Sequence, residues 1–359
     1  MKILILPSLC TPESGSAVLT ARNLADLFRI EGIPCAVCSD PASSFHGVSF
    51  YSAPRPVYSL YGGTGRSYEE YMKACGALNH TYLSSDYQAV SEAVRKFEPD
   101  LLIEISRPAA HAVAAESDIP LFSVVSVSEY RNQIFDASLL NGLNEFLSEH
   151  HLEQVLRLNA LSRMSSLRLA FGPDLFQPFS ASESIVRFGM PCIEPLPCRI
   201  ENRLSIVFAE SEQAPFQIRR IIRDAFLGAP YEVSVFLRDS QMKRKQNIRP
   251  VNRFRLSSVN GSRVCIHDGT DALTQYAIAL GIPQIIIHDS SYMRQWNAAA
   301  LRHSGAGLAI PETELTMEHL YETYRQVCAD DLFTENARRL KKEADALGDL
   351  SGLMNCLPR

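Results

Sequence analysis

Long uninterrupted apolar runs are missing from this chain of 359 residues, although 46% of them are hydrophobic. A helix that spans a membrane needs about 20 mostly apolar residues in a row, so the sequence predicts no transmembrane segment. The first residues, M-K-I-L-I-L-P, start as a signal peptide does, but the apolar run is too short for a signal core and Pro7 ends it. We interpret this stretch as a first buried strand and expect a cytoplasmic protein.

An excess of positive charge is also missing, since 35 basic residues stand against 40 acidic ones and the net charge is -5. Proteins that bind nucleic acid usually present a basic surface to the phosphates, so we expect no nucleic-acid partner. Two short basic groups are better explained as a solvated helix face and a loop. They are Arg219, Arg220 and Arg223, and the run Lys243, Arg244 and Lys245.

Clustered cysteines, which would indicate a disulfide framework or a zinc site, are not found. The nine cysteines are odd in number and scattered, which indicates reduced thiols. Cys35 and Cys38 form a C-x-x-C pair inside an apolar run, and we interpret both as buried strand residues and not as a redox pair. Nothing resembles a zinc site, because the adjacent His150 and His151 would face different directions on a helix and no second ligand pair stands nearby, so no metal is expected.

Apolar strands alternate with helices along the chain, which predicts an α/β protein with parallel sheets. The first half reads as strands at 3–6, 35–38, 101–105 and 120–127, with helices at 16–31, 86–97, 108–115 and 141–169. A stretch rich in Pro and Ser follows, and the alternation then restarts with strands at 204–208, 232–237, 254–256, 264–266 and 284–287 and helices at 215–227, 317–329 and 333–347.

A chain of this length is expected to form two domains. We predict an N-terminal domain at 1–180, a linker at 181–203, a C-terminal domain at 204–347 and a tail at 348–359.

The most informative segment is 267–297, H-D-G-T-D-A-L-T-Q-Y-A-I-A-L-G-I-P-Q-I-I-I-H-D-S-S-Y-M-R-Q-W-N. A short apolar strand runs into His267 and Gly269, a helix follows, and a second apolar strand begins after Pro283. This order places a helix N-terminus at the carboxyl end of a parallel strand, where backbone N–H groups and the helix dipole hold anions. The segment therefore predicts a site for a nucleotide diphosphate.

This segment resembles the donor-binding signature of GT-B glycosyltransferases that use nucleotide sugars, in particular the UDP-glycosyltransferase superfamily and its bacterial members that tailor antibiotics. The matching positions are His267, Gly269, Gly281, Pro283, Gln284, Asn297 and the run Gly305-Ala306-Gly307. The resemblance implies two Rossmann-like, doubly wound parallel-sheet domains that face a cleft. It also implies inverting, metal-independent transfer of a sugar from a UDP- or TDP-sugar to a hydroxyl of a small-molecule or lipid-like acceptor, with no cofactor besides this co-substrate.

On the donor side, the resemblance implies that His267 donates to a phosphate oxygen. Gly269 would let the backbone approach a phosphate, and Thr270 would supply a hydroxyl or cap the helix.

Three positions depart from the family pattern: Asp268 and Asp271 stand where it has Gly, and Gln275 stands where it has the Glu that binds ribose. A carboxylate in the first helical turn competes with a diphosphate for the same positive field, so weaker donor binding is predicted. In the loop that grips the donor sugar, Asp289 and Gln295 are the polar substitutes ahead of Asn297. Trp296, the single Trp, is more simply a core residue than a sugar platform.

On the acceptor side, relatives often have Gly-His in the first loop, with the His as general base. Here Gly15 matches, but Ser16 stands in place of the His, and a serine without a partner is no base near neutral pH. The Asp that orients the base is also displaced, with Glu104 one position early. Other candidates for the base are Glu13, Glu104 itself and His111.

Two further functions stay open. A homologue that has kept the scaffold and lost turnover would act as a binding partner or activator of an active enzyme. A sugar-nucleotide hydrolase or epimerase is a weaker alternative. The sequence leaves the oligomeric state open, including a homo-oligomer or a hetero-oligomer with another glycosyltransferase.

Overall fold

A computed structural model describes ten ranges of the chain, and every statement below concerns these ranges. They are 1–10, 16–41, 45–57, 65–130, 136–189, 202–208, 216–237, 243–251, 259–348 and 350–357. The chain divides into two compact units. Unit 1 comprises Met1–Phe171, Gln177–Ile193 and Asp349–Arg359, and unit 2 comprises Gly172–Phe176 and Glu194–Gly348.

Unit 1 is built on a parallel sheet of seven strands in the order β3-β2-β1-β4-β5-β6-β7. The strands are β1 Ile3–Pro7, β2 Cys35–Ser39, β3 Ser49–Ser52, β4 Leu101–Ile105, β5 Leu121–Val124, β6 Leu167–Phe171 and β7 Ile185–Phe188. Ile3 of β1 is in register with Cys35 of β2 and with Leu101 of β4. Strand order reverses between β1 and β4, and such a reversal opens a crevice at the carboxyl ends of the strands.

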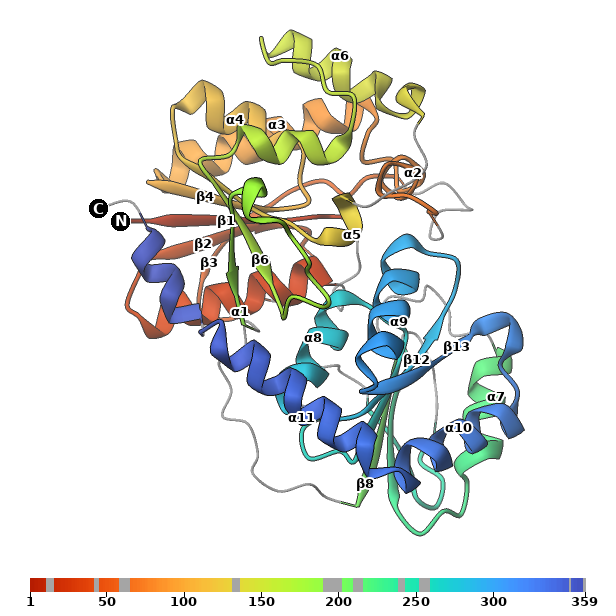
Figure 1. The fold of residues 1–359 in the computed structure, drawn as a ribbon. Helices are drawn as coiled ribbons and strands as arrows, with labels where there is room; N and C mark the ends of the chain where they lie inside the picture. The colour runs from red at the N-terminus through yellow and green to blue at the C-terminus, as the bar shows by residue number, and fades with distance from the viewer. Residues whose placement is uncertain are drawn as a thin grey trace. The chain divides into compact units, whose positions relative to one another are not determined.

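Both faces of this sheet are buried, because successive residues of a strand point to opposite sides. Ile3 and Ile5 pack in one core with α1, whereas Leu4 and Leu6 pack in another with α3 and α4. Figure 1 shows α1 on one side of the sheet and α3 and α4 on the other. The helices are α1 Ser16–Ile30, α2 Tyr68–Ala74, α3 His80–Phe97, α4 Ala109–Ser117, α5 Val127–Tyr130 and α6 Asn141–Glu149, with 3-10 turns at Ala137–Leu140, Leu158–Met164, Ala181–Glu183 and Leu350–Cys356.

Unit 2 repeats the plan with a parallel sheet of six strands in the order β10-β9-β8-β11-β12-β13. The strands are β8 Arg203–Phe208, β9 Glu232–Leu237, β10 Ile248–Pro250, β11 Val264–His267, β12 Gln284–His288 and β13 Gly307–Pro311. The helices are α7 Phe216–Phe226, α8 Asp271–Leu280, α9 Tyr292–Ser304, α10 Met317–Ala329 and α11 Asp331–Ala346, with a 3-10 turn at Glu312–Glu314. Helices α7 and α10 share a core with β8 and β9, whereas α8, α9 and α11 pack with β12.

The predicted α/β class with two parallel doubly wound sheets is confirmed. The helix predicted over 141–169 is wrong in its second half. Helix α6 ends at Glu149, where His151 adopts a left-handed conformation, and Leu167–Phe171 forms strand β6. Pairing with β5 and β7 on both sides overrides the helical pattern of this segment. The strand predicted at 254–256 lies outside the described residues.

The structure bears on two further predictions. Cys35 and Cys38 lie in the buried strand β2 as free thiols, as expected. Among the helices of the described ranges, none has the length and apolar character required to cross a bilayer. The C-terminal turn at Leu350–Cys356 packs on unit 1, where Leu353 joins the core of α1.

Candidate functional site

The turn from β11 into α8 is the part of unit 2 in which the predicted donor residues gather. His267 is the last residue of β11, Thr270 is the N-cap, and α8 begins at Asp271. Gly269 has a φ of 77°, and a Cβ there would lie 2.7 Å from Cγ2 of Ile286. Both the left-handed backbone and the tight contact require glycine at this position.

His267 is fully buried, and both of its ring nitrogens are used within this turn. Its Nδ1 accepts a hydrogen bond of 3.1 Å from the N–H of Gly269, and its Nε2 lies 2.8 Å from Oε1 of Gln284. An Nδ1 that accepts has no proton, so Nε2 carries the proton and donates to Gln284. Burial lowers the pKa of His267, against opposing effects of Gln284 and Asp268. In this arrangement the ring stabilises the turn. That His267 donates a hydrogen bond to a phosphate oxygen stays a prediction.

Asn297 of α9 connects to the same turn. Its Nδ2 donates to the carbonyl of Gly269 at 3.0 Å and to Oδ1 of Asp271 at 2.7 Å. The Asp271 carboxylate is therefore held by a side-chain amide. Asn297 is fully buried, and its Oδ1 has no hydrogen-bond partner among the described residues.

Two more polar side chains in the first turns of α8 are buried and have no hydrogen-bond partner among the described residues. Gln275 is 4% exposed, and neither Nε2 nor Oε1 forms a hydrogen bond in the described part of the chain. The same is true of Oγ1 of Thr274. A Cβ on Gly172 would lie 2.1 Å from Oε1 of Gln275, so the segment Gly172–Phe176 covers this amide. An unsatisfied buried polar group costs about 1–3 kcal/mol, and such groups in native proteins call for an explanation such as a ligand or a water.

The loop after β12 contains an ion pair that sequence reasoning missed. Nη1 of Arg294 lies 2.8 Å from Oδ2 of Asp289, and Oδ1 of Asp289 accepts from the N–H of Ser291. The backbone of Arg294 also passes close to Gly269, since a Cβ on that glycine would lie 3.5 Å from Cβ of Arg294. An arginine in the first turn of α9 was visible in the sequence, but the approach of its Cα and Cβ to Gly269 depends on the packing of α8 against α9.

The remaining residues predicted for the sugar loop do not join this cluster. Gln295 is exposed, one residue beyond Arg294. Trp296 donates from Nε1 to the carbonyl of Phe176 at 2.9 Å. This bond anchors the segment that contains Phe176, and Trp296 itself is half-buried.

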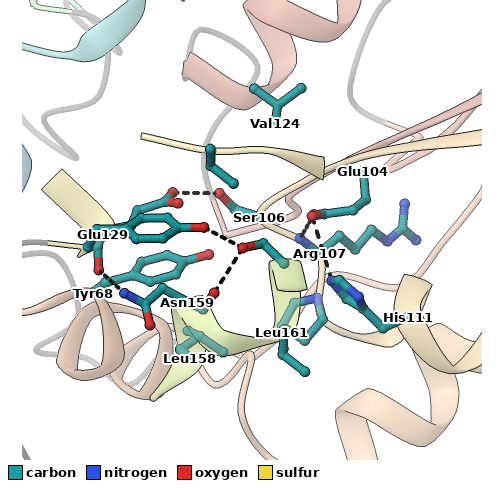
Figure 2. A pocket seen from close by; sticks show the side chains of 14 residues that line it. Tyr68, Glu104, Ser106, Arg107, His111, Val124, Glu129, Leu158, Asn159 and Leu161 are labelled. Carbon is teal, nitrogen blue, oxygen red and sulfur yellow. Dashed lines mark hydrogen bonds and ion pairs between the residues drawn. The ribbon is translucent and has the colours of Figure 1, made fainter. Parts of the chain in front are cut away.

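Unit 1 contains a pocket at the carboxyl ends of β4 and β5, shown in Figure 2. Its cavity of about 30 Å³ has room for one or two water molecules. Glu104, 4% exposed, accepts from the N–H of Arg107 at 2.9 Å through Oε2, and its Oε1 lies 3.6 Å from Nε2 of His111. The lining residues are Tyr68, Glu104, Ser106, Arg107, Pro108, His111, Val124, Val125, Glu129, Tyr130, Leu158, Asn159, Leu161 and Ser162.

Hydroxyl and amide groups line the other side of the pocket. Oγ of Ser106 donates to Oε1 of Glu129 at 3.0 Å, and Nδ2 of Asn159 donates to the carbonyl of Glu129 at 3.4 Å. The hydroxyls of Tyr130 and Ser162 are hydrogen-bonded to each other. Burial raises the pKa of Tyr130, so this phenol keeps its proton and can donate.

The pocket is fixed in place by a buried ion pair. Nε and Nη2 of Arg107 lie 3.0 and 2.6 Å from the two carboxylate oxygens of Asp86, and the guanidinium also donates to the carbonyl of Cys38. The side chains of Arg107 and Asp86 are 2% and 1% exposed. A bidentate pair of this kind is directional, so it ties the turn between β4 and α4 to helix α3 and strand β2.

The structure thus brings two of the four candidate bases together, Glu104 and His111. Ser16 is half-buried at the start of α1, and it is not among the residues that line the pocket. Glu13 lies outside the described residues. Proximity of Glu104 to His111 was not visible in the sequence, because it depends on the turn between β4 and α4.

One group of metal-binding residue types is close together in the described ranges. It comprises His80, Glu145 and Glu149, whose ligand atoms lie within 4.8 Å of one another. Nε2 of His80 is 2.7 Å from Oε2 of Glu149, so an ion pair between α3 and α6 accounts for this arrangement. None of the three lines the pocket.

Several solved structures share this fold over nearly their whole length. A glycotransferase of kitacinnamycin has a TM-score of 0.75 and 15% identity, covering 99% of this chain and 98% of that one. Glycosyltransferase VinC in complex with dTDP has a TM-score of 0.71 and 17% identity, covering 99% and 98%. SsfS6 of Streptomyces sp. SF2575, complexed with thymidine diphosphate, has a TM-score of 0.69 and 17% identity, covering 99% and 99%. The fold is therefore that of the GT-B glycosyltransferases.

A more particular likeness covers the C-terminal part. Residues 237–349 match the C-terminal domain of the family described as Erythromycin biosynthesis protein CIII-like. The matched range includes the turn between β11 and α8 and the residues of α9. The resemblance to glycosyltransferases of natural-product biosynthesis, inferred from His267 to Asn297, is confirmed. No curated protein sequence matches the chain.

The ion pair of Asp86 and Arg107 makes a prediction about stability. Asp86→Ala leaves a buried guanidinium without its counter-charge, which costs about 3–5 kcal/mol, and we expect this loss in urea denaturation. The matched control is Asp26→Ala, which breaks the exposed pair with Arg29 and should cost about 1 kcal/mol or less. Equal losses in the two variants would contradict the role of the buried pair.

The neutral His267 makes a prediction about pH. Its pKa is lowered in the folded chain by burial, so the unfolded chain binds the proton more readily. The stability from this group is complete above the unfolded pKa, about 6.5, and is lost as the pH falls toward the folded pKa. In His267→Gln this dependence is absent, so the stability difference from wild type should shrink as the pH falls below about 6.5. Parallel curves for the two proteins across this range count against a neutral buried ring.

Proposed function

We propose that the chain transfers a sugar from a UDP- or TDP-linked donor to a hydroxyl of a small-molecule or lipid-like acceptor, with inversion and without a metal. The observation that carries the proposal is the buried, unpartnered amide of Gln275 next to the N-terminus of α8. The fold and the family match of residues 237–349 support it. VinC and SsfS6 were both solved with thymidine diphosphate, and this favours a TDP-linked donor.

The diphosphate is the group that the turn between β11 and α8 is suited to bind. Helix α8 directs the positive end of its dipole at this place, and Gly269 lets the backbone come close to an anion. Asn297 holds the Asp271 carboxylate by a hydrogen bond, which limits the repulsion expected from the sequence. Arg294, in the next helix, lies with its Cα and Cβ close to Gly269, and its guanidinium is paired with Asp289.

Gln275 is the group suited to the ribose. Its Nε2 donates and its Oε1 accepts, so one amide can satisfy two adjacent ribose hydroxyls. These bonds would replace the partners that both atoms lack in the described structure. The amide is neutral, and its hydrogen bonds are weaker than those of a carboxylate. We therefore expect modest donor affinity.

The second candidate function is that of a homologue without turnover, acting as a binding or activating partner. Two observations favour it. Ser16 offers no imidazole at the position where related enzymes often have their base, and both nitrogens of His267 are occupied within the turn. A protein of this kind binds the nucleotide and releases no product.

Nucleotide binding tests the role of Gln275. We expect thymidine diphosphate to bind the wild type in calorimetric titration, and Gln275→Ala to bind about 5- to 10-fold more weakly because about 1 kcal/mol of hydrogen bonding is lost. The matched control is Gln326→Ala, an exposed glutamine of α10 in the same unit, which should bind as the wild type does. UDP is titrated in parallel to compare the two bases.

Three outcomes separate the alternatives. Binding that weakens in Gln275→Ala, with product formed, supports the transferase. The same binding without product from any donor and acceptor pair supports the partner role. Absence of binding by the wild type, or equal affinities of the wild type and Gln275→Ala, contradicts the proposed donor site.

A further inference from the structure

The pocket of unit 1 contains a titratable pair that the donor site does not use. It lies at the carboxyl ends of β4 and β5, the edge at which parallel sheets of this type bind ligands. Glu104 is the penultimate residue of β4, and His111 lies in the first turn of α4, so the turn between the two elements brings them within 3.6 Å. Figure 2 shows both side chains on the same side of the pocket.

Arg107, the neighbouring cation in the lining of the pocket, is not available to Glu104. The charge of Arg107 is balanced by Asp86, to which it is bound through two hydrogen bonds. Among the described residues, the Glu104 carboxylate accepts from the backbone N–H of Arg107 and faces the imidazole of His111. The carboxylate can therefore fix the orientation of the His111 ring.

The two nitrogens of His111 have different surroundings. Nε2 faces Glu104, whereas Nδ1 is buried and has no hydrogen-bond partner among the described residues. A carboxylate at Nε2 favours the tautomer with the proton there, which leaves the lone pair of Nδ1 available. Enzymes generally activate a hydroxyl nucleophile with an adjacent base, and a third group orients that base.

We propose that His111, oriented by Glu104, is the general base that removes the proton of the acceptor hydroxyl, in place of the imidazole that Ser16 does not supply. This inference rests on the proposed glycosyl transfer. Glu104 is the positioning residue, because its Oε2 is already held by the N–H of Arg107. Arg107 precedes His111 by one helical turn, so the ion pair with Asp86 also fixes the start of α4.

The step balances as follows. The acceptor O–H bond breaks, its proton forms a bond to Nδ1 of His111, and the oxygen forms a bond to the anomeric carbon of the sugar. The bond from this carbon to the diphosphate oxygen breaks at the same time, and the nucleoside diphosphate leaves with the electron pair. His111 then holds a positive charge beside Glu104, until its proton passes to water.

The lining of the pocket indicates the class of acceptor. Tyr130 and Asn159 can donate hydrogen bonds, and Glu129 can accept them. Arg107, the cation in the described part of the lining, is bound to Asp86 and is not available to an anionic acceptor. The cavity of about 30 Å³ has room for a hydroxyl group and not for a whole acceptor. We therefore expect the hydroxyl end of a neutral alcohol to enter it, and this hydroxyl needs a base.

The test compares two acceptors with thymidine diphosphate glucose as the donor. One is 4-nitrophenol, which ionises near neutral pH without help, and the other is a simple alkyl alcohol, 1-octanol. In His111→Gln we expect kcat with 1-octanol to fall about 100- to 1,000-fold, with KM little changed. With 4-nitrophenol at a pH where it is ionised, kcat should fall less than about 5-fold, because the lost contribution is general-base catalysis. A loss that is equal for both acceptors overturns the proposal.

Further variants keep the result independent of folding. The control His46→Gln changes an exposed histidine of unit 1 and should leave both rates unchanged. In His111→Ala, added imidazole should restore part of the rate with 1-octanol. Glu104→Gln should move the limb of the pH–rate profile that belongs to the base. An unchanged profile would show that Glu104 does not position His111.

Failure of this inference is distinguishable from failure of the glycosyl transfer. Wild type that transfers to both acceptors, with His111→Gln transferring as well to 1-octanol, overturns only the base. Wild type that transfers to neither acceptor overturns the transfer and the base together.

Discussion

The structure depends on how a strand passes into a helix at the carboxyl edge of a parallel sheet. In unit 2 the turn from β11 into α8 must bring the N-terminus of α8 to this edge of the sheet. Gly269 allows the tight turn against Ile286, and His267 holds it by accepting from the N–H of Gly269. Asn297 ties the same turn to α9. Because these side chains are used to hold the backbone, the helix dipole and the amide of Gln275 are the groups left for a ligand.

In unit 1 the equivalent turn is held by charged residues. The turn from β4 into α4 is anchored by the buried pair of Arg107 and Asp86, and Glu104 accepts from its backbone. This arrangement brings His111 beside Glu104 at the carboxyl ends of β4 and β5. Under the proposed function, the two parallel sheets use the same edge for two different tasks, one of them anion binding and the other proton transfer.

The sequence predicted the fold well, since buried parallel strands are short apolar runs and the glycines mark the turns that need them. It also found the segment from His267 to Asn297. It missed what arises from contacts between distant residues, such as the pairing of β6 with β5 and β7 that ended the helix predicted over 141–169.

The same limit applies to the sites. Glu104 and His111 were separate candidates in the sequence, and only the turn between their elements joins them. Arg294 was overlooked because its proximity to Gly269 depends on α8 packing beside α9. The state of His267 could not be inferred either, since its tautomer follows from bonds to Gly269 and Gln284.

The most direct test of the central claim is a crystal structure of the chain with thymidine diphosphate. The account predicts the diphosphate at the N-terminus of α8 near Gly269, and both amide atoms of Gln275 hydrogen-bonded to the ribose. A nucleotide bound elsewhere, or a Gln275 amide still covered by Gly172 while the nucleotide is in place, would contradict it.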